Sequence, residues 1–229
     1  MSYTVNGVGI RRGLISVPAS GVWHANVSLD IATPVASGPA TLQLGSQRWM
    51  GTVYRSDLFA GTVSLRVLGG AGGYVTAMPA KAYRGATART VCADIVGTAG
   101  ESLSSTSSVQ LLATPLQFWS CLKSASAAWA MTRLAEQVQK QNGHAPATWR
   151  VLPDGSTFFG PPTYAPVELS SDQAQIVAYH VVEMAYEVAM VEPLILPGMA
   201  WNGRNIDRTE FELLPEGIRA IVFFRGANA

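Results

Sequence analysis

The sequence predicts a mainly β protein that carries a small α+β insertion in its middle. Three observations predict this fold class. Long stretches at both ends of the chain alternate apolar and polar side chains with the period of two that half-buried strands show. A cluster with four glycines in five positions, Gly69–Gly73, interrupts this pattern, because glycine loses too much backbone freedom in a helix or strand. After the cluster, two stretches have helical spacing.

The first part of the chain is expected to form an antiparallel sheet. Residues 3–10 predict a hairpin, because Asn6-Gly7 suits a type I′ turn. Residues 23–30 alternate strictly, with Trp23 on the apolar face and His24 on the polar face. The same period returns at residues 42–44, 49–54 and 62–67, with prolines and glycines between them. Such a series is typical of a barrel or sandwich.

The centre of the chain predicts two helices and a hairpin. Thr87 can cap a helix that Gly100 ends, and its apolar residues recur every four positions. A second helix is expected over residues 127–138 and is closed by Asn142-Gly143. Residues 149–160 have the Pro-Asp-Gly turn of a hairpin. The stretch between the helices, residues 109–122, is not assigned.

The last third is expected to return to sheet. Ile176–Val191 has apolar positions that fit a strand and others that fit a helical face, and the strand is the favoured interpretation. Phe211 and Leu213 precede a Pro215-Glu216-Gly217 turn, after which an apolar run predicts the second arm of a final hairpin.

Composition limits the classes of function. The net charge of +1 provides no basic field for tight binding of nucleic acid. The two cysteines, Cys92 and Cys121, lie in apolar surroundings without a metal-binding spacing, so small buried thiols are expected. The start of the chain has no signal-peptide pattern, and no uncharged apolar run reaches the ~18 residues that span a bilayer. We therefore expect a protein without a membrane segment that is made in the cytoplasm.

Reactive residues do not converge in the sequence, and no catalytic, cofactor or metal residue is predicted. His24, His144 and His180 are far apart, and His180 lacks the second histidine at position 184 that a zincin needs, because Met184 stands there. Asp154-Gly155-Ser156 fits a hairpin turn better than a nucleophile. The glycine cluster lacks the spacing of a phosphate loop and is interpreted as a joint between two structural parts.

The order of segments resembles the baseplate hub proteins of contractile phage tails, with Mu-like tails as the nearest comparison. The resemblance is carried by the opening VNG hairpin, RVLGGAGG, YRGATARTVCADIVGTAGESLS, the helix followed by WRVLPDGSTFFG, and the closing LPGMAWNGRNIDRTEFELLPEGIRAIVFF. It covers most of the chain and rests on turns and patterned strands.

The resemblance implies a fold of two tail-tube-like antiparallel β-barrels joined by a small helical segment. Residues 1–82 would form the first barrel, residues 83–165 the α+β insertion with two helices and a hairpin, and residues 166–229 the strands that complete the second barrel. It also implies a non-enzymatic structural hub without cofactors. Three copies would form a ring in the virion baseplate, assembled in the host bacterial cytoplasm.

The partners that the resemblance implies are two further copies, a tail tube or distal tube protein, a central spike protein and the tape measure protein. DNA would pass through the lumen during ejection without specific binding. The alternatives are a hexameric tail-tube or distal-tail protein, which one barrel per chain would favour, and a cell-wall-binding module or hydrolase. Alternation alone does not say which face of the sheet lines a lumen.

Overall fold

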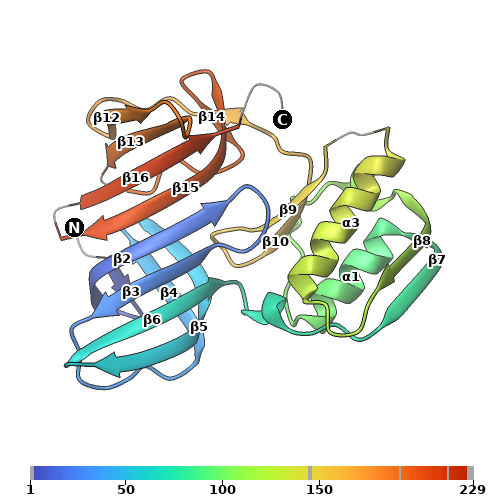
Figure 1. Cartoon of the computed structure of the whole chain (residues 1–229), viewed down its shortest axis with the longest axis horizontal. Helices are drawn as coiled ribbons and strands as arrows, with labels where there is room; N and C mark the ends of the chain where they lie inside the picture. The colour runs from blue at the N-terminus through green and yellow to red at the C-terminus, as the bar shows by residue number, and fades with distance from the viewer. Residues whose placement is uncertain (1–2, 144–145, 191, 216, 226–229) are drawn as a thin grey trace. The chain divides into compact units, whose positions relative to one another are not determined.

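The computed structural model describes residues 3–143, 146–190, 192–215 and 217–225, and the chain divides into two compact units (Figure 1). The first unit comprises Met1–Ala19, Trp23–Gly69 and Thr163–Ala229, and the second comprises Ser20–Val22 and Gly70–Pro162. The first is built from strands and the second mixes helices and strands, so the predicted mainly β fold with an α+β insertion is confirmed.

The two units do not test the predicted division into residues 1–82, 83–165 and 166–229, but they group residues 20–22 and 70–82 with the second unit and residues 163–165 with the first. Residues 70–82 belong to the second unit, because Tyr74 packs on Trp149 with ring centroids 4.8 Å apart and Lys81 pairs with Asp94. The division into three domains remains a prediction.

Six strands of the first unit close into an antiparallel barrel. They are β1 (Tyr3–Val5), β2 (Val8–Pro18), β3 (His24–Leu29), β4 (Gly38–Leu44), β5 (Gln47–Phe59) and β6 (Thr62–Gly69). Their order is β1-β4-β5-β6-β3-β2, and the pairing of β1 with β2 closes the ring. The predicted opening hairpin is confirmed, since both Asn6 and Gly7 have positive φ angles, of 50° and 83°.

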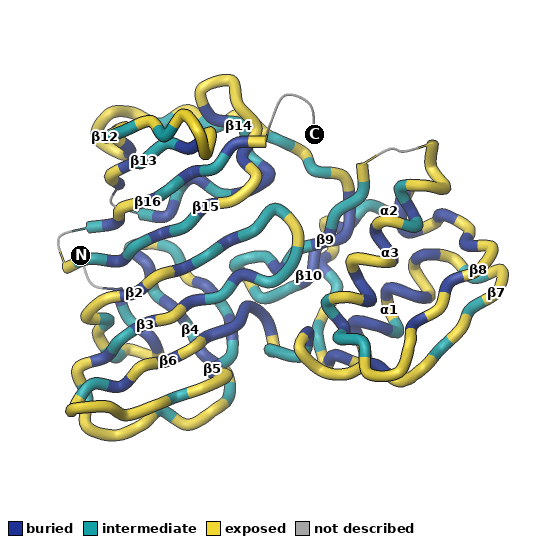
Figure 2. Tube along the Cα trace, viewed as in Figure 1, coloured by how far each residue is buried: buried dark blue, intermediate teal, exposed yellow. Residues whose placement is uncertain are grey.

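The interior of the barrel is filled by the apolar residues that alternate along these strands (Figure 2). Trp23 and Trp49 are almost completely buried and meet edge to face, with ring centroids 5.3 Å apart. Gly51 and Gly69 lie against Trp23, where a Cβ on either residue would collide with the indole. The large aromatic core is therefore accommodated by glycines on neighbouring strands.

The remaining strands of the first unit continue the same sheet. They are β11 (Ala165–Pro166), β12 (Ala174–His180), β13 (Ala185–Met190), β14 (Met199–Trp201), β15 (Arg204–Leu214) and β16 (Gly217–Phe224). β15 pairs with β2 outside the barrel, and the order runs on through β16 and β13 to β12. Both strands in residues 174–190 agree with the strand interpretation of that stretch. Within the described part of the chain β12 pairs with β13 alone, so β12 is an edge strand.

The second unit packs helices on two-stranded ribbons. Its elements are the 3-10 helix η1 (Gly73–Val75), β7 (Lys81–Thr87), α1 (Ala88–Thr98), α2 (Val109–Leu112), β8 (Pro115–Cys121), α3 (Ala127–Gln141), β9 (Thr148–Val151) and β10 (Thr157–Gly160). Both long helices and the β9–β10 hairpin lie where the sequence predicts them. The unassigned stretch 109–122 contains α2 and β8, because its apolar residues change from helical to strand spacing at Thr114.

Capping and turn residues set the ends of the two long helices; Thr87 and Gly100 do so as predicted, whereas the cap at Ser126 was not predicted. The side chain of Thr87 accepts a hydrogen bond from the backbone of Thr90 at 3.3 Å, and Ser126 does the same for Trp129 at 3.1 Å. Gly100 follows α1 with a φ of 68°, a conformation in which glycine avoids the strain of a Cβ.

Candidate interaction surfaces

The histidines that the sequence singles out are not brought together. His24 lies half-buried on the outward face of β3, whereas a solvated position was expected. Burial lowers its pKa, Arg66 lowers it further, and Glu210 partly opposes this. His180 ends β12, and its Nε2 lies 3.5 Å from a carboxylate oxygen of Glu187. His144 lies outside the described residues.

Asp154-Gly155-Ser156 forms the turn between β9 and β10, as predicted. One carboxylate oxygen of Asp154 accepts hydrogen bonds from the backbone N–H of Ser156 at 2.9 Å and from its hydroxyl at 2.7 Å. The serine hydroxyl therefore donates to a carboxylate and closes the turn.

The glycine cluster is held by a carboxylate of its own unit. Glu101 accepts hydrogen bonds from the backbone N–H groups of Ala71 at 2.9 Å and Gly73 at 2.8 Å. A phosphate cradle offers such N–H groups to a ligand, but here they already have an acceptor. Burial raises the pKa of Glu101, and the backbone hydrogen bonds oppose this rise. The carboxylate therefore positions the turn at which the second unit begins.

Both cysteines are free and buried, as the sequence predicts. Burial raises the pKa of Cys92 to about 12, and it also raises the pKa of Cys121. Burial therefore disfavours the thiolate, which is the reactive form, at both cysteines.

One polar cluster of the second unit was not predicted. The ammonium group of Lys81 lies 2.6 and 2.7 Å from the two carboxylate oxygens of Asp94, and the hydroxyl of Tyr83 donates to the same carboxylate at 2.6 Å. Burial acts to raise the pKa of Asp94, but the hydrogen bonds from Lys81 and Tyr83 outweigh it, so the pKa lies below its usual value. Lys81 and Asp94 lie on β7 and α1, so the cluster fastens the helix to the ribbon.

The outward face of the continuous sheet is polar and carries charge pairs between neighbouring strands. Arg12 on β2 lies 3.2 Å from Glu212 on β15, and Arg219 on β16 lies 3.3 Å from Glu187 on β13. These residues alternate with the core residues, which point to the opposite face. Because each of these arginines has a carboxylate partner, these pairs add no net positive charge.

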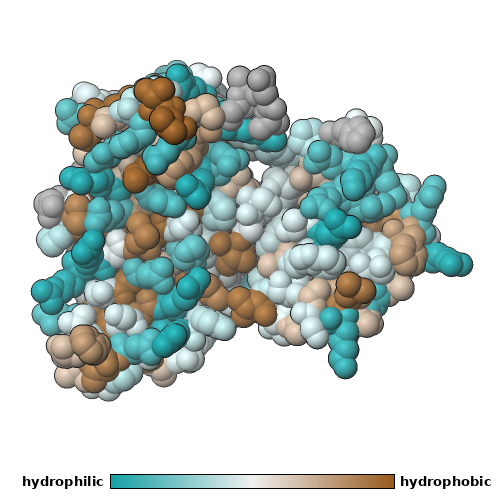
Figure 3. Space-filling view, in the orientation of Figure 1, coloured by the Kyte–Doolittle hydropathy of each residue, from teal (hydrophilic) through white to brown (hydrophobic). Residues whose placement is uncertain are grey.

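Exposed apolar side chains of the first unit gather on two hairpins, where Figure 3 shows hydrophobic residues at the surface. The β12–β13 hairpin exposes large apolar residues along β12 and at its turn, and Val182 is 96% exposed. The β5–β6 hairpin exposes Phe59 to 82%. The exposed residues of the two hairpins are Ile176, Val177, Tyr179, Val181, Val182 and Met184 on the first, and Tyr54, Leu58 and Phe59 on the second. Apolar groups gathered in this way typically mark surfaces that a partner covers.

An arginine stabilises the aromatic side chains beside β12. The guanidinium group of Arg204 lies 5.2 Å from the ring of Tyr179, 5.6 Å from Tyr186 and 5.7 Å from Phe224. It also donates a hydrogen bond of 3.0 Å to the hydroxyl of Tyr179. This contact holds Tyr179, a residue of the edge strand, in a fixed orientation.

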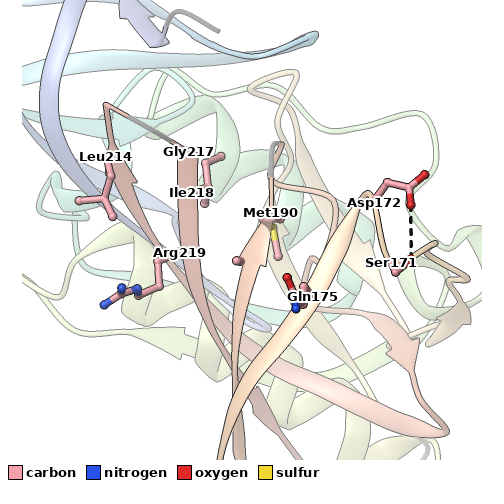
Figure 4. Close-up of a pocket in the computed structure, with 9 residues that line it drawn as sticks. Ser171, Asp172, Gln175, Met190, Leu214, Gly217, Ile218 and Arg219 are labelled. Atoms are coloured by element: carbon pink, nitrogen blue, oxygen red, sulfur yellow. Dashed lines mark hydrogen bonds between the residues drawn. The ribbon is translucent and has the colours of Figure 1, made fainter.

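A hollow of about 340 Å³ lies at the ends of β12, β13, β15 and β16 (Figure 4). Asp172 and Arg219 are its charged lining residues, and Figure 4 shows them on separate sides of the hollow. Asp172 accepts a hydrogen bond from the Ser171 hydroxyl at 3.3 Å. No group of three or more histidine, cysteine or acidic residues in the described ranges could hold a metal ion.

Solved structures with a similar fold cover nearly the whole chain. The 43 kDa tail protein of prophage MuSo2 from Shewanella oneidensis has a TM-score of 0.67 at 10% identity, over 98% of this chain and 97% of that one. The fold is that of a phage tail protein. The tail protein from Neisseria meningitidis MC58 gives a TM-score of 0.64 at 12% identity, over 99% and 97% of the two chains. The resemblance to Mu-like tail proteins is therefore confirmed at the level of the fold.

The same tail-protein fold also matches the Escherichia coli c3393 protein, with a TM-score of 0.65 at 8% identity over 99% of this chain and 78% of that one. That protein is described as a component of the type VI secretion system with structural similarity to the T4 bacteriophage tail proteins gp27 and gp5. No protein-family model and no curated protein sequence matches the chain. In the part of the chain that the structure describes, no helix combines the length and apolar character needed to cross a membrane.

Proposed function

We propose that this protein is a structural hub of a phage tail or of a phage-like contractile particle. The proposal rests on the arrangement of strands in the first unit. Six strands close into a barrel, and barrel strand β2 pairs with β15, which belongs to a second group of strands. In the sequence, most of the α+β unit, residues 70–162, lies between the barrel strands and this second group. The proposal is supported by the tail proteins of prophage MuSo2 and of Neisseria meningitidis MC58, which have a similar fold over nearly their whole length.

Three copies would form a ring. In each copy the closed barrel would occupy one barrel position of the ring, and the second group of strands would occupy the next. Such a ring has six barrel positions and three identical chains, so it fits a hexameric tail tube on one side and a trimeric central spike on the other. The tape measure protein and DNA would pass through its centre. The balanced charges on the outward face of the sheet are compatible with passage of DNA without tight binding.

The proposed role is non-enzymatic and needs no cofactor. The candidate reactive groups make structural contacts, which supports this part of the proposal. Ser156 closes a turn, Glu101 holds the glycine cluster, and both thiols are buried. A hexameric tail-tube or distal-tail protein is the second candidate within the same class. The second group of strands favours the hub, because a tube subunit needs one barrel.

The mass of the purified full-length chain in solution tests the proposal. Light scattering is expected to give three chains, either for the protein alone or after the spike protein encoded beside it is added. A tube protein should bind the opposite side of the same ring. A chain that stays monomeric with both partners, or a six-chain ring, would contradict the hub.

A further inference from the structure

One exposed apolar hairpin contains the edge strand β12, and the other contains the part of β5 that extends beyond its pairing with β4. The path β5-β6-β3-β2-β15-β16-β13-β12 contains eight strands, and each pairing along it is antiparallel. β12 ends this path on one side. On the other side, β4 pairs with β5 only as far as Val53, so residues 54–59 have β6 as a neighbour on one side alone among the described strands.

Among the described strands, β12 and residues 54–59 of β5 each have a neighbouring strand on one side only, so the backbone on the other side could pair with a further strand. β12 has seven residues and the distal part of β5 spans residues 54–59, so the two segments match in length. In the loop before β4, the backbone N–H of Val35 donates a hydrogen bond of 3.0 Å to the side-chain oxygen of Ser56 on β5. The loop therefore lies beside this edge at Ser56, but among the described residues no backbone hydrogen bond joins residues 30–37 to residues 54–59. Unpaired edges with apolar side chains are templates for another strand.

The strand directions allow β12 of one copy to pair with β5 of a second copy in an antiparallel arrangement. Eight antiparallel strands place β5 and β12 in opposite directions. If the next copy is related by rotation about an axis along the strands, its β5 lies antiparallel to β12 of the first copy. Such a contact is heterologous, and it closes into a ring when the rotation allows.

The charges of the two hairpins are also complementary. Residues 172–187 contain three carboxylates, Asp172, Glu183 and Glu187, and no lysine or arginine. Residues 54–66 contain two arginines, Arg55 and Arg66, and one acidic residue, Asp57, so their formal charge is +1. Glu187 is already paired with Arg219, and Arg55 with Asp57. This leaves Asp172 and Glu183 on the first hairpin and Arg66 on the second, and the two carboxylates disfavour contact of β12 with another β12.

We infer that β12 of one copy pairs with residues 54–59 of β5 in the next copy, and that this contact joins the subunits. Pairing would satisfy both free edges and cover the apolar residues of both hairpins. The occupant of each edge is thus a second copy of this chain. The inference deepens the proposed hub and rests on its ring, because it names the surfaces through which the copies meet.

Crosslinking between two single variants tests the contact. In the full-length protein, Leu58→Cys and Val177→Cys each place one accessible thiol on one edge, since both side chains are exposed and the natural cysteines are buried. A short bismaleimide is expected to give a dimer when the two variants are mixed and none with either variant alone. Leu58→Cys mixed with Val109→Cys, an exposed residue of the second unit, is the control and should give no dimer.

The outcomes separate this contact from the hub itself. A dimer formed by Val177→Cys alone, or no dimer in the mixture at the highest soluble concentration, would overturn the inference. A three-chain particle that lacks the mixed crosslink overturns the contact and leaves the hub in place. The variant with both thiols in one chain is expected to give a closed product of three chains. A longer ladder would support the edge pairing and contradict a three-chain hub.

A charge on the edge provides a second test that needs no crosslinking. Val177→Lys places a charge on β12, as many proteins do to prevent edge pairing. The dissociation constant for self-association should rise about tenfold or more. Val109→Lys should leave it unchanged, and an unchanged constant for Val177→Lys would overturn the inference.

Discussion

The two units of this protein differ in where their exposed large apolar side chains lie. In the second unit the exposed large apolar residues lie on separate elements, namely Val75, Val109, Phe118, Leu122 and Trp129. Among the described residues of the first unit, nine such residues lie on the two hairpins, and the tenth is Leu14. The exposed apolar side chains of the second unit are therefore scattered, whereas those of the first are concentrated on two hairpins. This difference is the basis for proposing that subunits meet through the strands and not through the inserted unit.

Removing a central tryptophan from either core should have the largest effect. Trp49→Ala in the barrel and Trp149→Ala in the second unit each replace a fully buried indole and should lower the free energy of unfolding by about 3–5 kcal/mol. Hydrogen exchange locates the loss. Trp49→Ala should remove protection from β1–β6 and retain it in α1 and α3, and Trp149→Ala should do the reverse. Loss of protection in both units with either variant would contradict two independent cores.

A methyl group at Gly73 should damage the second unit at the place where the chain enters it. The new Cβ would overlap the carbonyl oxygen of Ala99, which follows α1, so Gly73→Ala should cost about 1–3 kcal/mol. Gly97→Ala is the matched control, because no atom lies within 4 Å of its Cβ and alanine favours a helix by up to about 1 kcal/mol. Denaturant titration measures both. If both variants changed the free energy of unfolding equally, the overlap with the Ala99 carbonyl would be relieved by a small shift of Ala99, and the prediction would be wrong.

The Lys81–Asp94 pair should make the second unit sensitive to acid. The pKa of Asp94 is lowered in the folded state, so its contribution is present above the usual carboxyl pKa and is lost as pH falls through the folded value. Asp94→Asn should therefore cost about 0.5–1.5 kcal/mol at pH 7, and the difference from the unmodified protein should shrink below about pH 4. Thermal unfolding from pH 3 to 7 measures this.

An exposed ion pair in the same unit provides the control for Asp94. Glu136→Gln removes the partner of Arg133 on the surface of α3, where both side chains are about half exposed. It should change the free energy of unfolding by no more than about 0.5 kcal/mol. A pH-independent difference for Asp94→Asn would show that Asp94 does not fasten α1 to β7 through its charge.

Polar replacements on the exposed hairpins should have the smallest effect on folding. Phe59→Ser and Val182→Ser remove side chains that are mostly in solvent, so stability should change by less than about 0.5 kcal/mol. Self-association should weaken for both variants but not for Val109→Ser in the second unit. Sedimentation velocity at several concentrations measures the association. A stability loss above about 1 kcal/mol would mean that these residues support the fold of the isolated chain.

Much of the fold followed from local patterns in the sequence. Alternation located the strands of the barrel, and the Asn6-Gly7 turn and the caps at Thr87 and Ser126 act within a few residues of themselves. The stretch Ile176–Val191 was ambiguous, because its apolar residues satisfy both periods; Val191 lies outside the described residues, and in the rest the pairing of β13 with β16 selects the strand. The Lys81–Asp94–Tyr83 cluster had no local signal, since it exists only when α1 packs on β7.

The sequence by itself determined the class of the fold, the break after Gly69, and the absence of a pattern typical of a catalytic site, because these depend on residue types at short spacing. Tertiary structure alone decided that β2 pairs with β15, that six strands close while β12 remains an edge of the described sheet, and that the end of β5 extends beyond its pairing with β4. The physical reason is that alternation defines two faces of each strand but not the neighbour with which the strand pairs. Those neighbours are far away in the chain, and they determine which surfaces are left for a partner.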